Sequence, residues 1–129
     1  RLTQPGPLSM PPAERITISE VDGVKVVRFL DRQLFDERTV REVADQIAAK
    51  LPNDGKPIRL VLDFTDVGLI SSTLLSKLIL LQRRVDGTHG KLRLCELSPV
   101  LQQVFRTSIL DRLFGVDRDL RSSMELLRA

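Results

Sequence analysis

The sequence predicts an α/β fold: a small mixed β-sheet with an N-terminal hairpin and about four α-helices packed mainly on one face. Residues 58–64 form a short, almost continuously apolar run, which is typical of a strand buried on both faces. Two β-branched runs separated by Asp22 and Gly23 indicate a hairpin. An amphipathic helix lies between the hairpin and the buried run, so the chain must cross over and pair two strands in parallel.

Length and composition indicate one globular domain. The chain has 129 residues, of which 42% are hydrophobic and 29% charged, values that are ordinary for a soluble protein. No apolar run approaches the ~20 residues of a membrane-spanning helix and no signal-peptide pattern opens the sequence, so we expect no direct membrane insertion. Cys95 is the single cysteine, which favours a reducing, cytoplasmic location. The net charge of +3 and the absence of Trp and Tyr argue against a nucleic-acid surface.

The first residues differ in character from the rest. Prolines are frequent before residue 15 and no hydrophobic period is present, so we expect residues 1–14 to form a flexible arm and residues 15–129 to form the domain. The domain begins with the β-branched runs at residues 16–21 and 24–30. The Asp-Gly link between them is a strong hairpin signal, because both of its residues need a positive φ angle.

The first helix is amphipathic. Its apolar residues recur at helical spacing and form one stripe that faces a core: Val40, Val43, Ala44, Ile47, Ala48 and Leu51. Asp36 or Thr39 can cap the start, and Thr39 with Glu42 has the spacing of a capping box. The Pro-Asn-Asp-Gly sequence at residues 52–55 ends the helix before the buried strand.

Consecutive hydroxyl residues, Ser71, Ser72 and Thr73, precede the second helix. They follow the buried strand after a short loop, at a helix start where backbone amides point outward and where open α/β sheets usually place their functional groups. The helix is apolar around most of its circumference, through Leu74, Leu75, Leu78, Ile79, Leu80 and Leu81. Such a helix is either deeply buried or partly docked against another protein, and both can hold at different turns.

The C-terminal part predicts a strand and further helices. Residues 91–97 alternate as a strand does, and Ser98 followed by Pro99 indicates a helix start. The inner face of this helix is Leu101, Val104 and Phe105, and the core is expected to continue through Ile109, Leu110, Leu113 and Phe114. A last helix begins at Asp117 and turns Leu120, Met124 and Leu127 inward.

Catalytic constellations are scarce. The single histidine, His89, lies in a predicted turn, and Cys95 lies inside a predicted strand without a histidine near it in sequence. Asp63 and Asp66 flank the end of the buried strand, where a pair of carboxylates is more often a loop cap than an acid–base pair. The sequence has no metal-ligand spacing and no glycine-rich phosphate loop. We therefore expect a protein that is not an enzyme and that needs neither cofactor nor metal.

Several segments resemble the STAS domain of bacterial anti-sigma factor antagonists. The resemblance is centred on Leu62-Asp63-Phe64, Val67 and the Ser-Ser-Thr-Leu-Leu-Ser sequence of residues 71–76, where that family typically has Asp-Ser-Ser-Gly-Leu-Gly. It continues through residues 90–95, Ser98-Pro99, Val104-Phe105 and residues 110–114, and it extends over residues 16–127. The resemblance implies a STAS-like fold, a small mixed sheet with helices packed mainly on one side.

The resemblance also implies a partner switch that regulates transcription. The unmodified antagonist would bind an anti-sigma factor that is also a serine kinase, and so free a sigma factor. Phosphorylation by that kinase would end the binding, and a PP2C-type phosphatase would restore it. The family's phosphorylated serine falls on Ser72, with Ser71 and Thr73 as alternates, and the aspartate that opens its first helix falls on Asp36. The implied partner-binding residues are Asp36, Asp63, Ser71, Ser72, Thr73, Leu74, Leu75 and Leu78.

The chain departs from the family pattern beside the implied phosphorylation site. Ser71 stands where the family has aspartate, and Leu74 and Ser76 replace both glycines. One alternative is therefore that residues 71–73 only cap the helix, although a serine can both cap and accept phosphate. A second alternative is a non-catalytic scaffold subunit of a stress-signalling assembly or a lipid-transport complex. The sequence identifies neither the partner, the kinase nor the phosphatase, and it leaves open whether the domain pairs with itself as a homodimer.

Overall fold

A computed structural model describes residues 13–128 of the protein, apart from the side chain of residue 108. Most of the arm expected over residues 1–14 lies outside the described residues. The helices and strands, in chain order, are β1 (Ile16–Val21), β2 (Val24–Phe29), β3 (Gln33–Leu34), α1 (Glu37–Lys50), β4 (Arg59–Asp63), β5 (Leu69–Ile70), α2 (Ser72–Gly87), β6 (Lys91–Cys95), α3 (Pro99–Phe105), α4 (Ser108–Leu113), β7 (Gly115–Val116) and α5 (Leu120–Arg128).

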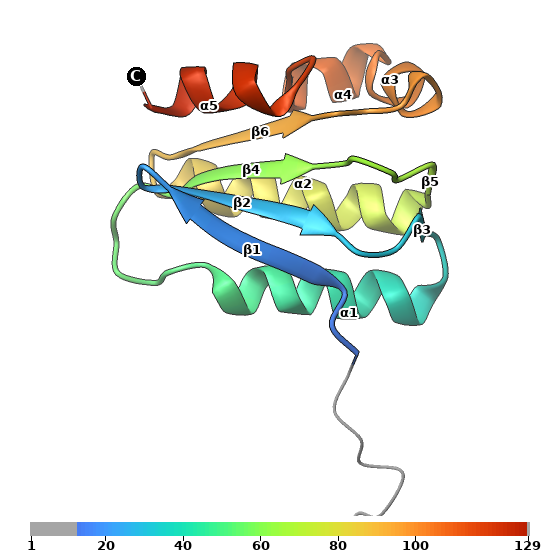
Figure 1. Ribbon diagram of the computed structural model, residues 1–129, viewed down its shortest axis with the longest axis horizontal. Coiled ribbons are helices and arrows are strands. Elements are labelled where there is room, and N and C mark those ends of the chain that lie inside the picture. The colour runs from blue at the N-terminus through green and yellow to red at the C-terminus, as the bar shows by residue number, and fades with distance from the viewer. Residues whose placement is uncertain (1–12, 129) are drawn as a thin grey trace, which may run out of the picture.

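The main sheet is mixed, as predicted. Its strand order is β1-β2-β4-β6-β7, with β1 antiparallel to β2 and every other pairing parallel (Figure 1). The hairpin turns at Asp22 and Gly23, whose φ angles of 53° and 78° are those that the Asp-Gly signal requires. β3 and β5 form a separate two-stranded parallel sheet at one end of the molecule.

β4 is the central strand. It pairs with β2 on one side and β6 on the other, and Leu60, Val61 and Leu62 are fully buried. Leu60 and Leu62 belong to the larger core, and Val61 belongs to a second, smaller one. The prediction of a strand buried on both faces is therefore confirmed, because its alternate side chains enter two different cores.

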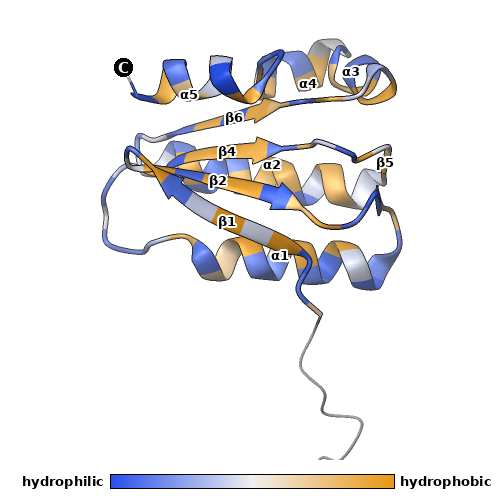
Figure 2. Ribbon diagram, viewed as in Figure 1, coloured by the Kyte–Doolittle hydropathy of each residue, from blue (hydrophilic) through white to orange (hydrophobic). Residues whose placement is uncertain are grey.

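Helices cover both faces of the sheet. The larger core contains the buried apolar residues of α1 and α2, and the smaller core receives Leu127 of α5 on the opposite face. Figure 1 shows α1 and α5 on opposite sides of the strands, with α2 behind β2 and β4, and Figure 2 shows that hydrophobic residues dominate the central strands. Polar contacts with Asp117 connect α5 to the sheet. Arg93 of β6 donates two hydrogen bonds to the Asp117 carboxylate, at 2.7 and 2.8 Å, and the hydroxyl of Ser123 in α5 donates one to the same carboxylate at 2.7 Å.

The segment after Ser98 differs from the prediction. Ser98 does cap a helix that begins with Pro99, but this helix ends at Phe105 and α4 forms a second short one. Phe114 is buried and its ring contacts Phe105 at 5.6 Å between centroids. Ile109 and Leu113 are 70% and 39% exposed, so the prediction that they continue the core is wrong. A six-residue helix turns one face inward, and here that face presents Leu110 to the core.

Candidate functional site

The two expected site segments begin the helices α1 and α2. The side chain of Ser71 is the N-cap of α2, because its Oγ accepts a hydrogen bond from the amide of Leu74 at 3.1 Å. Ser72 and Thr73 are the first two helical residues and both are exposed. The three hydroxyls therefore differ: one stabilises the helix start, and two face solvent where the helix amides and the positive end of the helix dipole lie.

Asp36 is the N-cap of α1. Its carboxylate accepts a hydrogen bond from the amide of Thr39 at 3.0 Å, and this bond holds the pKa of Asp36 below its usual value. The capping box considered for Thr39 and Glu42 is not formed. Thr39 lies inside the first turn with its side chain buried, and Glu42 accepts hydrogen bonds from Arg15 and Arg38 instead, which lower its pKa.

The small β3–β5 sheet brings these two helix starts together. Leu34 pairs with Ile70, and the amide of Ser71 donates to the carbonyl of Leu34 at 3.0 Å. A second bond, at 2.8 Å, joins the amide of Gly68 to the carbonyl of Arg32. Asp36 and Ser72 each follow a strand of this pair by two residues. The helices α1 and α2 therefore begin at the same end of the molecule, beside β3 and β5 (Figure 1).

Exposed apolar side chains lie beside the hydroxyls. Phe35, which directly follows β3, is 57% exposed, and Leu69, the first residue of β5, is 41% exposed. Between the starts of α1 and α2 is a hollow of ≈ 280 Å³, lined by Phe35, Glu37, Val40, Arg41, Thr73 and Lys77. Sequence reasoning missed Phe35 and Leu69; their position next to a helix cap, outside any periodic apolar stripe, is the signal that could have found them. We call Phe35, Asp36, Leu69, Ser72 and Thr73 the switch edge.

Of the two carboxylates at the end of β4, that of Asp63 caps the following loop. Asp63 is 5% exposed, and its carboxylate accepts hydrogen bonds from the amide and the hydroxyl of Thr65 at 2.9 and 2.6 Å. Asp66 occupies the left-handed region with φ of 68° and lies 3.7 Å from a guanidinium nitrogen of Arg28. Asp63 therefore has the loop-cap role that sequence reasoning preferred, whereas the Asp66 carboxylate contacts Arg28 instead.

The apolar residues of α2 divide by face. Leu74 and Leu78 are each 1% exposed and belong to the larger core, so their side chains are not available to a partner in this structure. Leu75 is half-buried, and Leu80 is 59% exposed. The helix is therefore buried along one stripe and open to solvent along another. Leu75 and the switch edge are among the residues that could contact a partner near Ser72.

The remaining candidate groups do not assemble a reactive centre. His89 is exposed in the turn after α2, and burial raises the pKa of the Cys95 thiol to about 12, so that thiol stays protonated. Within residues 13–128, no three His, Cys, Asp or Glu side chains are grouped so that they could hold a metal ion. No helix in the described part of the chain is long and apolar enough to cross a membrane.

Comparisons with known proteins show which family and which relatives the sequence resembles. The sequence model of the STAS domain family matches residues 15–123. BtrV of Bordetella bronchiseptica, which carries the name of an anti-sigma factor antagonist, is 26% identical over 102 residues, which are 79% of this chain and 84% of that protein.

Solved structures show the same fold. An anti-sigma factor antagonist from Mycobacterium paratuberculosis superposes with a TM-score of 0.75 at 22% identity, over 88% of this chain and 93% of that one. The anti-sigma factor antagonist SpoIIAA in its unphosphorylated form superposes with a TM-score of 0.65 at 15% identity, over 88% of this chain and 98% of that one.

Proposed function

This chain belongs to the STAS domain family, and from that membership and the switch edge we propose that it acts as an anti-sigma factor antagonist. The unmodified protein binds an anti-sigma factor that is also a serine kinase, and binding frees a sigma factor for transcription. The kinase transfers the γ-phosphoryl group of ATP to Oγ of Ser72, which loses its proton as ADP leaves. A PP2C-type phosphatase hydrolyses the phosphoserine with water and restores binding.

The observation that carries this proposal is that Ser71 and Ser72 have different positions at the start of α2. Ser71 makes the capping hydrogen bond, so the cap does not require the hydroxyl of Ser72, which is exposed at the first helical position. An exposed hydroxyl that the fold does not use can accept phosphate without loss of a structural contact. The alternative that these hydroxyls only cap the helix accounts for Ser71, but it gives the hydroxyl of Ser72 no function.

The switch edge also supports a protein partner. Phe35 and Leu69 are large apolar side chains that remain exposed at this end of the molecule; aromatic residues such as Phe35 are enriched at protein interfaces, and exposed apolar patches mark interaction sites. Asp36, Ser71 and Thr73 complete the rim, while Asp63, Leu74 and Leu78 hold the loop and the helix from beneath. BtrV, whose name is that of an anti-sigma factor antagonist, supports the choice of partner class.

Phosphate at Ser72 would act by blocking this surface. A phosphoserine carries about −1.5 to −2 charges near neutral pH. In the free protein the charge faces water and the amides of the helix start, which stabilise it. In the complex the partner would have to bury it, and an unpaired buried charge costs several kcal/mol.

The test uses each anti-sigma factor kinase encoded in the source genome, purified separately. Calorimetry measures its affinity for the antagonist, and mass spectrometry locates phosphate after incubation with ATP. We expect one kinase to bind and to phosphorylate Ser72, so that Ser72→Ala removes the phosphate. Ser76→Ala is the matched control, because Ser76 is also an exposed helical serine one turn away. Absence of binding to every kinase would refute the proposal, and binding without phosphate transfer would favour the scaffold alternative.

A further inference from the structure

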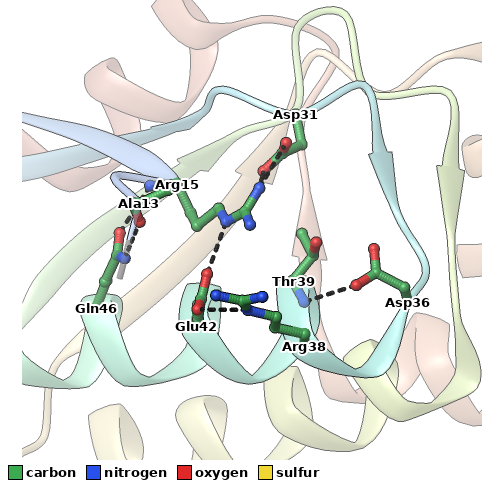
Figure 3. Close-up of polar contacts among 8 residues, drawn as sticks. All are labelled: Ala13, Arg15, Asp31, Asp36, Arg38, Thr39, Glu42 and Gln46. Atoms are coloured by element: carbon green, nitrogen blue, oxygen red, sulfur yellow. Dashed lines mark hydrogen bonds and ion pairs between the residues drawn. The ribbon is translucent and has the colours of Figure 1, made fainter. Parts of the chain in front are cut away.

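Arg15, immediately before β1, joins three parts of the chain that are distant in sequence. Its guanidinium donates to both carboxylate oxygens of Asp31 at 3.1 and 3.3 Å, and its Nε donates to Glu42 of α1 at 2.9 Å (Figure 3). The side chain is only 21% exposed, and those of Asp31 and Glu42 are 29% and 12% exposed. A partly buried guanidinium that binds two carboxylates is a rigid connection, because its donors form a fixed planar fork.

The backbone beside Arg15 is also held. Its amide donates to the side-chain oxygen of Gln46 at 2.8 Å, and the side-chain nitrogen of Gln46 donates to the carbonyl of Ala13 at 2.7 Å. The carbonyl of Arg15 accepts a bond from the amide of Leu30 at 2.9 Å. Figure 3 shows this strip of chain lying along α1, with the guanidinium reaching Asp31. We call Arg15, Asp31, Glu42 and Gln46 the clamp.

Asp31 begins the segment that carries two residues of the switch edge, Phe35 and Asp36. The next residue, Arg32, accepts a hydrogen bond from the amide of Gly68, and Leu34 accepts one from the amide of Ser71. Phe35 and Asp36 follow directly. A connection that holds Asp31 against α1 therefore restricts the segment 31–36 at its first residue, while the cap at Asp36 restricts it at its last.

We propose that Arg15 is a positioning residue of the switch edge: through Asp31 and Glu42 it holds the segment 31–36 in the conformation that pairs with the loop before Ser72. The effect on partner binding rests on the proposed function. A preordered segment binds more tightly because its conformational entropy is already lost in the free protein. When only a fraction of molecules holds the binding conformation, the apparent affinity falls by that fraction.

The test compares Arg15→Met with Arg128→Met in the full chain. Both remove one positive charge, but Arg15 loses its ion pairs with Asp31 and Glu42, whereas Arg128 loses only its pair with Asp22 at the hairpin turn. Amide hydrogen exchange is measured by NMR at Gly68 and Ser71, whose amides donate to the held segment, and in β4 and β6. In Arg15→Met we expect exchange about tenfold faster at Gly68 and Ser71, with little change in the two central strands. Arg128→Met should leave these rates unchanged.

The second arm measures affinity for the kinase that binds the wild-type protein. We expect about three- to tenfold weaker binding by Arg15→Met, and the double variant with Asp31→Asn should be no weaker than Arg15→Met, because both changes remove one shared contact. Unchanged exchange at Gly68 and Ser71 would overturn the inference, as would faster exchange spread equally over β4 and β6. Faster local exchange with unchanged affinity would also overturn the positioning role. If no kinase binds the wild-type protein, the proposed function fails. The exchange rates at Gly68 and Ser71 then decide alone whether Arg15 holds the segment 31–36.

Discussion

At the start of α2, neighbouring hydroxyls have different roles because each occupies a different position of the helix. An N-cap residue lies outside the helical φ/ψ region, and its side chain turns back onto the free amides. Ser71 has this geometry, with φ of −94° and ψ of 163°. Ser72, one residue later, is helical and its side chain points to solvent. Sequence alone could not separate the two, because serine suits both positions.

This difference predicts unequal effects of two matched substitutions. Ser71→Ala removes the acceptor of the Leu74 amide and should lower the free energy of unfolding by about 1 kcal/mol. Ser72→Ala removes an exposed hydroxyl and should change it by less than about 0.5 kcal/mol. Urea unfolding followed by circular dichroism measures both. Equal effects of the two changes would contradict the assignment of the cap to Ser71.

At the level of elements, the position of α5 against the sheet is stabilised by hydrogen bonds of Asp117 with Arg93 and Ser123. Asp117 accepts two hydrogen bonds from Arg93 and one from Ser123, whose side chain is fully buried. The hydrogen bonds from Arg93 lower the pKa of Asp117, and burial opposes this effect. Because the pKa in the folded state lies below the unfolded value, the carboxylate stabilises the fold above the unfolded pKa. That stability is lost as the pH falls through the folded pKa.

Asp117→Asn should therefore destabilise the protein mainly at neutral pH. The amide cannot form the charged pair with Arg93, so we expect a loss of about 2 kcal/mol at pH 7. The difference from wild type should narrow as the pH falls below about 4, where the unfolded wild-type carboxyl binds a proton. Unfolding free energies between pH 7 and pH 2.5 measure this trend, with Asp45→Asn on the exposed face of α1 as control. A difference that stays constant over this range would contradict the role of the charge.

Elements with strong local signals were predictable, and those that depend on distant partners were not. The structure confirms the predicted hairpin, β4 and α1. They could be predicted because the Asp-Gly link, the continuous apolar run and the helical apolar stripe each lie within one segment of the sequence. β3, β5 and β7 have two residues each and exist only through pairing with distant strands. No local pattern reports such pairing, so these three strands could not be predicted.

At the scale of the whole molecule, the switch edge and the cores are separate. Leu74 and Leu78 belong to the larger core, whereas the side chains of Ser72 and Phe35 are exposed and lie outside it. The site could be predicted in part: Asp36 and Ser72 begin helices at one end of the sheet, as the alternation of strands and helices implies. The contacts of Arg15 could not, because 16 and 27 residues separate it from Asp31 and Glu42.

This separation predicts that phosphorylation of Ser72 changes binding without changing the fold. The added charge faces solvent at the positive end of α2, where it should stabilise the free protein by roughly 0.3–1 kcal/mol. The protein phosphorylated by its cognate kinase should therefore unfold at a similar or slightly higher temperature, and its amide spectrum should shift only near residues 33–36 and 69–76. Affinity for the anti-sigma factor should fall at least about a hundredfold, because the partner cannot leave the phosphate in water. Ser72→Asp carries a single charge and serves as a partial mimic with a smaller loss. Spectral shifts that extend through β2, β4 and β6 would show instead that phosphate acts by rearranging the core.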